Sequence, residues 1–202
     1  MISNTCSLPE KLQLIYNLER LCLGSLFEEE INVVVAQMSN SDVSGCDLHT
    51  VSLWSYLLRA HRYEVSSDVF AKFKDEEGTF AWRNPQDLLS LYNAAYYRIH
   101  GEIILDEAIS FSKTCLESIV PYLEQEGTFS REITRAFQIP IPRRVKAYEA
   151  KFYISVFENE NTVDRMILEL GKIELQSRAN SASTRAKNYY KVNQLLLLEK
   201  LF

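Results

Sequence analysis

Glycine, proline and long apolar runs are scarce in this sequence of 202 residues. Only six residues are glycine and five are proline, whereas 11% are aromatic, so a solvated low-complexity chain is excluded. Apolar runs stay short, as at Leu195–Leu198, and none approaches the roughly 20 residues of a membrane span. Because the polar start Met1–Ser7 is unlike a secretory signal, we expect a compact cytoplasmic protein.

An excess of positive charge and paired cysteines are also missing. The sequence has 22 Lys and Arg against 27 Asp and Glu, and the resulting net charge of −5 gives no electrostatic reason to expect nucleic acid or an anionic membrane as partner. No CxxC motif occurs, and no histidine stands where it would complete a zinc site. We therefore interpret four cysteines as free thiols: Cys6, Cys22, Cys46 and Cys115.

Acidic residues and histidines do not form metal-binding patterns. All seven aspartates stand singly, although Mg²⁺ bridged to a diphosphate needs carboxylates close together. Glu28–Glu30 begin a predicted helix, where the dipole favours negative charge. Residues 75–78 are interpreted as a solvated turn, with a weak cation site as the alternative. None of the histidines has a cysteine or carboxylate at ligand spacing: His49, His61 and His100.

Motifs for nucleophilic catalysis and phosphate cradling are absent as well. The sequence contains neither a Gly-x-Ser-x-Gly turn nor a glycine-rich loop. Its most basic cluster before the tail, Arg143, Arg144 and Lys146, is assigned a positioning or surface role, with anion binding as the alternative. We therefore assign no catalytic, cofactor-binding or metal-ligating residue.

Apolar residues recur at helical spacing almost throughout, which predicts an all-α fold of about ten helices. The first helix has a capping box of Ser7 and Glu10, and Gly24 is placed to end it after Leu23. Asp47 is predicted to cap the third helix, and Pro121 to end or kink the longest. The further predicted helices are 27–38, 47–60, 67–73, 86–97, 103–123, 128–137, 146–157, 163–176 and 192–202.

The composition changes after Gln176. Residues 177–183 contain hardly an apolar side chain, and residues 184–191 are basic. We predict one helical domain over residues 8–176 and a divergent tail over residues 177–202, with helical potential from residue 188.

Several strings occur in a characteristic order along the chain. They are Leu8-Pro9-Glu10-Lys11-Leu12, Phe27-Glu28-Glu29-Glu30-Ile31, Leu57-Leu58-Arg59 with His61, Tyr63 to Phe70, Asp87 to Ala95, His100-Gly101-Glu102 and Pro142-Arg143-Arg144. Together they resemble the amino-terminal domain of plant terpene synthases. The resemblance covers residues 8–176 and implies an α/α barrel-like bundle that precedes a separate catalytic domain.

The resemblance also implies the family's chemistry, which is Mg²⁺-dependent ionisation of a prenyl diphosphate followed by cyclisation in terpenoid biosynthesis. Complete enzymes of this lyase family hold Mg²⁺ with a DDxxD motif and a second metal motif, and neither occurs in this sequence. A DxDD motif for protonation is absent too. The chain is thus expected to be inactive alone, as a truncated or aberrantly spliced product whose parent resides in cytosol or plastid.

Two alternatives stay open at this point. The chain could be a non-catalytic helical interaction module that docks to the catalytic domain of another synthase, or a fragment without a function of its own. Departures from the family pattern bear on folding. Arg62 stands where the family usually has Gly, and it costs about 1 kcal/mol if that position needs a positive φ. Gly171 stands where the family has Ala, at a cost of about 1 kcal/mol in helix propensity.

Overall fold

The chain is helical over most of the part that a computed structural model describes, which is residues 7–123, 127–158 and 164–180. These residues contain eight α-helices and three 3₁₀ helices but no strand, only an isolated bridge between Lys74 and Phe80. The predicted all-α class is confirmed. Within the described ranges no helix has the length and apolar character needed to cross a membrane.

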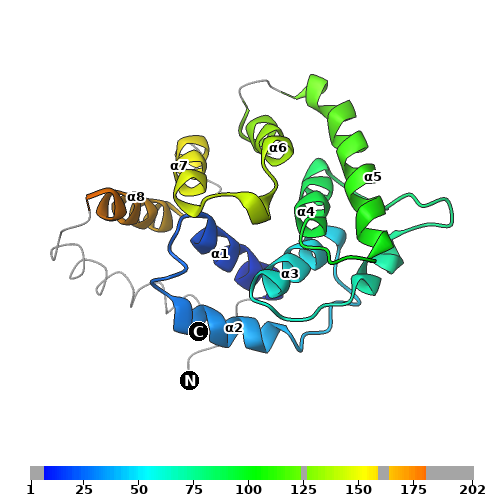
Figure 1. Cartoon of the computed structure of the whole chain (residues 1–202), viewed down its shortest axis with the longest axis horizontal. Coiled ribbons are helices and arrows are strands. Elements are labelled where there is room, and N and C mark those ends of the chain that lie inside the picture. The colour runs from blue at the N-terminus through cyan, green and yellow to red at the C-terminus, as the bar shows by residue number, and fades with distance from the viewer. Residues whose placement is uncertain (1–6, 124–126, 159–163, 181–202) are drawn as a thin grey trace. The chain divides into compact units, whose positions relative to one another are not determined.

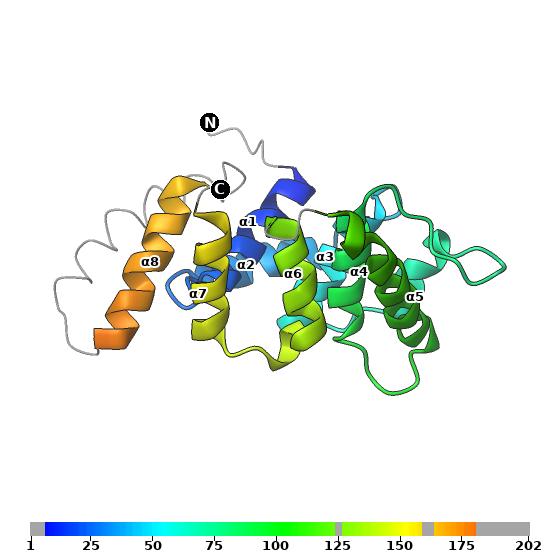
Figure 2. The same cartoon turned by 90° about the horizontal axis from the view of Figure 1, so that it is seen from above.

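The helices form two compact units, which we call the terminal unit and the central unit. The terminal unit joins the chain up to Met38 with the chain from Val145 onward, and the central unit spans Ser39–Arg144. The four α-helices of the terminal unit are α1 (Leu8–Arg20), α2 (Glu28–Met38), α7 (Lys146–Phe157) and α8 (Arg165–Asn180). Helix α1 contacts the other three, and α7 lies beside α8 in both views (Figures 1 and 2).

Helix α1 begins as its sequence predicts and ends earlier. The carboxylate of Glu10 accepts a hydrogen bond from the backbone N–H of Ser7 at 2.7 Å, which confirms the capping box. The helix ends at Arg20 rather than Leu23, because Cys22 adopts a left-handed conformation with φ of 62°. The chain therefore turns before Gly24 is reached.

The central unit is built around α4 (Pro85–Ala95), which packs against α3 (Leu48–Ala60) and α5 (Ile103–Ile119). Its remaining elements are η1 (Ser67–Phe73), η2 (Val120–Tyr122), α6 (Thr128–Gln138) and η3 (Ile141–Arg143). One buried apolar cluster joins α4, α5 and α6 through Leu88, Leu89, Tyr92, Leu116, Ile133 and Ala136. This cluster fixes where the segments after α4 and α6 begin.

Most predicted boundaries agree with the structure to within a few residues. Asp47 caps α3 by accepting a hydrogen bond from the N–H of Thr50 at 2.8 Å, as predicted. The longest predicted helix ends at Ile119 and continues as η2, which contains Pro121. Helix α8 continues past Gln176 to Asn180. The predicted helix 192–202 and Cys6 lie outside the described residues, and the division into 8–176 and 177–202 stays a prediction.

Two positions departing from the family pattern have unusual surroundings. Arg62 has φ of 67°, which confirms that a side chain occupies a left-handed position there. At Gly171, an added Cβ would lie 2.9 Å from Cδ2 of Leu21 and 3.1 Å from its Cβ. The close approach of α8 to Leu21 therefore favours glycine at this position, which helix propensity alone does not indicate.

Candidate functional site

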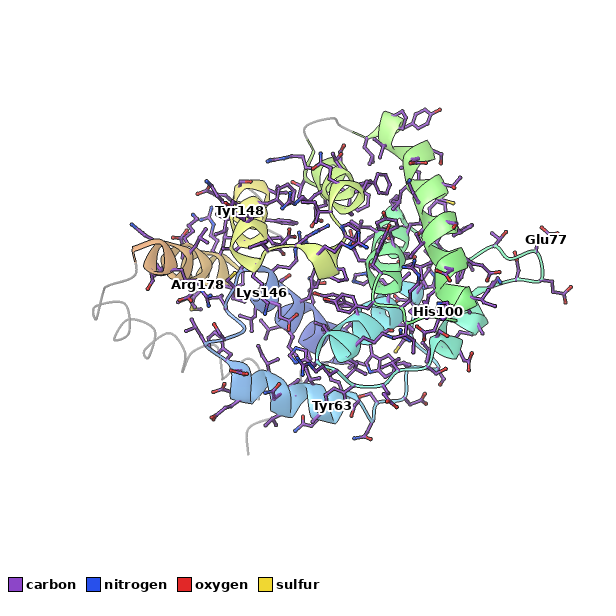
Figure 3. All side chains as sticks on the ribbon, viewed as in Figure 1. Tyr63, Glu77, His100, Lys146, Tyr148 and Arg178 are labelled. Atoms are coloured by element: carbon purple, nitrogen blue, oxygen red, sulfur yellow. The ribbon has the colours of Figure 1, made fainter. Side chains whose placement is uncertain are left out.

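The acidic residues in the described segments do not gather into a metal site. Glu28–Glu30 lie in the first turn of α2, as predicted. The Oδ1 atom of Asp75 accepts hydrogen bonds from the N–H of Glu77 and of Thr79, so this carboxylate stabilises a turn, and Figure 3 shows Glu77 at its outer end. Over residues 7–123, 127–158 and 164–180, no group of three His, Cys, Asp or Glu residues could hold a metal ion. The family's Mg²⁺ thus has no fitting ligand set in these segments.

The three histidines have separate structural surroundings. Nδ1 of His49 lies 2.7 Å from Oγ of Ser90, and burial lowers the pKa of His49 although two nearby aspartates oppose the shift. His61 is the C-cap residue directly after α3, and its backbone N–H donates to the carbonyl of Leu57. His100 is exposed in the connection from α4 to α5 (Figure 3). Among the residues that the structure describes, no carboxylate is hydrogen-bonded to the His49 ring, so the pair with Ser90 lacks the orienting group of a catalytic triad.

The cysteines in the described segments are free thiols, in agreement with the prediction. Cys22 is buried, and Cys46 and Cys115 are half-buried. Burial raises the pKa of Cys22 and of Cys115. A raised pKa reduces the thiolate fraction at neutral pH, so these two cysteines are poor nucleophiles.

A partly buried ion pair in the central unit joins two of the strings that carry the family resemblance. Nη1 and Nη2 of Arg59 each donate to a carboxylate oxygen of Glu102 at 2.6 Å. The guanidinium of Arg59, together with the N–H of Ile99, lowers the pKa of Glu102. Arg59 also donates to the carbonyls of Tyr97 and Val65. The pair therefore fixes the α4–α5 connection to the end of α3.

The terminal unit contains a second Arg–Glu pair, which is buried. Nη2 of Arg20 donates to Oε1 of Glu149 at 2.9 Å, which joins α1 to α7. The guanidinium lies 4.2 Å from the centroid of the Tyr153 ring, and the hydroxyl of Tyr153 donates to Oδ1 of Asn17 at 2.9 Å. Both ion pairs were missed at the sequence level, because their partners are far apart in the chain and no local pattern connects them.

An apolar groove of about 550 Å³ lies on the terminal unit between α7 and α8. Its largest exposed apolar side chain is Tyr148, which is 70% exposed. Figure 3 labels Tyr148 on α7 and Arg178 on α8. The lining residues are Ala147, Tyr148, Lys151, Ile154, Lys172, Leu175, Gln176 and Arg178.

A second, polar pocket of about 400 Å³ lies in the central unit. It is lined by residues of the α4–α5 connection and of the segment that follows α6, including Arg98, His100 and Arg143. The predicted basic cluster is thereby divided. Arg143 lines this pocket, Nε of Arg144 donates to the carbonyl of Ile139, and Lys146 begins α7 of the terminal unit.

Comparison with known proteins gives a consistent result. Residues 1–137 match the family model described as "Terpene synthase, N-terminal domain". Over 172 residues the chain is 55% identical to a chloroplastic alpha-terpineol synthase of Zea mays, covering 85% of this chain and 27% of that protein. It is 45% identical to a beta-sesquiphellandrene synthase of Sorghum bicolor, covering 86% of this chain and 31% of that protein.

A solved structure agrees with these relatives. The isoprene synthase of grey poplar, Populus x canescens, in complex with three Mg²⁺ ions, superposes with a TM-score of 0.72 at 30% identity. The match covers 84% of this chain and 34% of the poplar enzyme. The chain thus spans about a third or less of the length of each of these proteins.

Proposed function

The chain belongs to the terpene synthase family, and from this premise we propose that it acts as the amino-terminal helical domain of a plant enzyme of terpenoid biosynthesis. The family-model match to an N-terminal domain carries the proposal. The described residues add support, because they offer no group of ligands for the Mg²⁺ that the resemblance implies. We therefore derive no metal-dependent step from this chain.

In this proposal, ionisation of the prenyl diphosphate belongs to a separate catalytic domain, and the chain alone has no turnover. What it supplies is a helical body held together by the buried pair Arg20–Glu149 and the partly buried pair Arg59–Glu102. The prenyl chain length and the terpene product are set by the catalytic domain, so the identity of the amino-terminal domain should not change the product.

A domain exchange tests this function directly. Residues 8–176 would replace the matching residues of the Zea mays alpha-terpineol synthase, with the unaltered enzyme as control. We expect the chimera to fold and to form the same product as the control, measured by gas chromatography with geranyl diphosphate and Mg²⁺. A chimera that is folded by circular dichroism but forms no terpene would contradict the proposal.

The groove between α7 and α8 gives the proposed docking surface for the catalytic domain. An exposed tyrosine over apolar lining is the kind of feature that anchors protein interfaces. The match also covers only 27% and 31% of the two relatives, so each is more than three times as long as the part shared with this chain, and most of it lies outside the match. The same surface would serve the second candidate function, a non-catalytic interaction module that binds another synthase.

Substitution in the groove tests the docking. Tyr148→Glu should abolish co-purification of the chain with a separately expressed terpene synthase catalytic domain, because it places a charge in the apolar contact. Tyr122→Glu is the matched control, since Tyr122 is 88% exposed and lies in the central unit. Equal capture by both variants, or no capture by the unaltered chain, would contradict docking through this groove.

For localisation we propose the cytosol for this chain and the plastid for a longer parent protein. Support for the plastid comes from the maize relative, which is described as chloroplastic. Imaging of fluorescent fusions of the chain and of the protein encoded by the complete locus tests both assignments. A plastid signal from the 202-residue chain would contradict the first.

A further inference from the structure

The polar pocket of the central unit has no part in the proposed function. We propose that it is an anion-binding site that takes the phosphoryl group of a small phosphorylated ligand, such as inorganic diphosphate or a phosphate ester. The site consists of Arg98, His100 and Gly101 from the α4–α5 connection and Arg143 from η3, around a volume of about 400 Å³. This inference is independent of any catalytic domain.

The core of the unit holds the two segments of the pocket in place. The rings of Tyr92 on α4 and Phe137 on α6 pack edge to face with centroids 5.4 Å apart. Tyr96, at the end of α4, packs edge to face on Tyr92 at 4.9 Å and also lines the pocket. Because Arg98 follows Tyr96 and Arg143 follows α6, the basic side chains extend from positions that the apolar cluster has already fixed.

Cations exceed anions around the pocket. Nε of Arg98 is paired with the carboxylate of Asp106, the one acidic side chain of the lining. Arg143 and His100 make no side-chain hydrogen bond or ion pair with any residue the structure describes. Glu102, although close in sequence, directs its carboxylate to Arg59 and the N–H of Ile99. One arginine therefore remains uncompensated, beside an imidazole that can donate a hydrogen bond.

The backbone leaves room for a ligand next to these side chains. Gly101 has φ of +94°, and a Cβ at this position would meet no heavy atom within 4 Å. Only glycine adopts this conformation without strain, and it leaves open space over the peptide. An oxyanion can approach a backbone of this kind closely, which a side chain would prevent.

The two arginines favour an oxyanion as ligand. A guanidinium offers several N–H donors in a planar fork that matches the oxygens of a phosphoryl group, and such charge-assisted hydrogen bonds are stronger than neutral ones. Arg98 directs its Nε edge to Asp106, which leaves its terminal nitrogens for a ligand. Two arginines from different segments suit an anion with more than one negative charge.

Titration of the 202-residue chain tests the site. Inorganic phosphate, inorganic diphosphate and geranyl diphosphate would be added separately, without metal, and followed by calorimetry and by the backbone amide signals of His100 and Gly101. We expect diphosphate to shift both signals and its dissociation constant to rise about tenfold in Arg143→Gln and in Arg98→Gln. Arg83→Gln, at an exposed arginine of the same unit outside the lining, should change it less than twofold.

Comparison of the probes identifies the source of the phosphoryl group. Equal affinity for inorganic and geranyl diphosphate would assign the site to the free anion, and tighter binding of geranyl diphosphate at the same amides would assign it to an ester. Absence of shifts at His100 and Gly101 with all three probes would overturn the proposal. So would an affinity that Arg98→Gln and Arg143→Gln leave unchanged, once circular dichroism shows that the variants are folded.

Discussion

The terminal and central units each contain an Arg–Glu ion pair with little exposure, but the units are built from the chain in different ways. Each contains an arginine paired with a glutamate: Arg20 with Glu149 in the terminal unit, and Arg59 with Glu102 in the central unit. The central unit is one continuous segment of the sequence. The terminal unit combines two segments that are separated in the sequence by all of Ser39–Arg144. The terminal pair therefore closes by far the longer loop.

This difference indicates where the fold is most sensitive. Contacts between distant segments must offset a larger loop-closure entropy before they stabilise the protein. In the terminal unit, α1 meets α7 through the ion pair and through the Asn17–Tyr153 hydrogen bond. In the central unit, Arg59 keeps two backbone carbonyl partners besides Glu102. Arg20 keeps the hydroxyl of Tyr16, a neutral side-chain partner, at 3.1 Å. Because Arg59 retains two backbone carbonyls in fixed positions, we expect loss of the carboxylate to cost more stability in the terminal unit.

The largest effect is expected for Glu149→Ala. It leaves the guanidinium of Arg20 buried without its carboxylate, which should lower the free energy of unfolding by about 3–5 kcal/mol in urea titrations. Hydrogen exchange should accelerate in α1 and α7 while α4 keeps its protection. The control Glu117→Ala removes the exposed pair with Lys113 and should change stability by about 0.5 kcal/mol or less. A loss of under about 1 kcal/mol in Glu149→Ala would remove the distinction between the units.

The next effect is expected for Glu102→Gln in the central unit, at about 2 kcal/mol at pH 7, because a charged hydrogen-bond acceptor is lost. This substitution should also change how the free energy of unfolding depends on pH. The pKa of Glu102 is lowered in the folded protein, chiefly by hydrogen bonds from Arg59. The stabilisation is therefore complete above the unfolded pKa of about 4.3 and is lost as pH falls through the lower folded pKa.

Unfolding free energies measured at steps from pH 7 down to pH 3 check this dependence. The unaltered chain should lose stability below about pH 4.3, and Glu102→Gln should lose less over the same range. Glu76→Gln, at an exposed glutamate, is the control and should keep the slope of the unaltered chain. Identical slopes for Glu102→Gln and the unaltered chain would show that the pair does not couple folding to pH.

A smaller loss is expected for Gly171→Ala in the terminal unit. Helix propensity favours alanine by about 1 kcal/mol, but the new Cβ would lie 2.9 Å from Cδ2 of Leu21. Overpacking of this kind costs about 1–3 kcal/mol, so a net loss of about 1 kcal/mol should appear in the thermal midpoint and the urea titration. Gly45→Ala, with no heavy atom within 4 Å of its Cβ position, should be near neutral. A gain in stability for Gly171→Ala would mean that α8 does not need this close approach.

The smallest effect is expected for Arg62→Gly in the central unit. Arg62 has φ of 67°, and glycine removes the strain of a side chain there while adding freedom to the unfolded chain. A net gain of about 0.5 kcal/mol should be measurable by urea titration. Arg62→Ala keeps the Cβ and should bring no gain. Equal gains in both variants would assign the effect to the arginine side chain rather than to the backbone.

Local signals in the sequence predicted most of the fold. The capping box of Ser7 and Glu10 and the cap at Asp47 lie within four residues of their partners, so their roles follow from short-range geometry. The family resemblance marked position 62 as one where glycine is usual, and the structure gives Arg62 the positive φ that was considered there as a condition. Apolar periodicity predicted the all-α class because it reports which face of each helix is buried.

The features that depend on distant contacts could not be predicted in the same way. Arg59 and Glu102 were each part of a family-like string, but nothing in the sequence indicated that they pair. The sequence predicted that Gly171 destabilises its helix through low helix propensity. The structure shows that the missing Cβ allows α8 to lie close to Leu21. The pocket around Arg98 and Arg143 joins segments that only the packing of α6 on α4 brings together. In each case the partner is determined by tertiary structure.

The central proposal is that this chain acts as an amino-terminal domain and forms no terpene on its own. Incubation of the purified 202-residue chain with Mg²⁺ and geranyl, farnesyl or geranylgeranyl diphosphate tests it most directly, with the domain-exchange chimera as positive control. The account predicts no terpene above the protein-free background for all three substrates. A product that depends on both the chain and Mg²⁺ would contradict it.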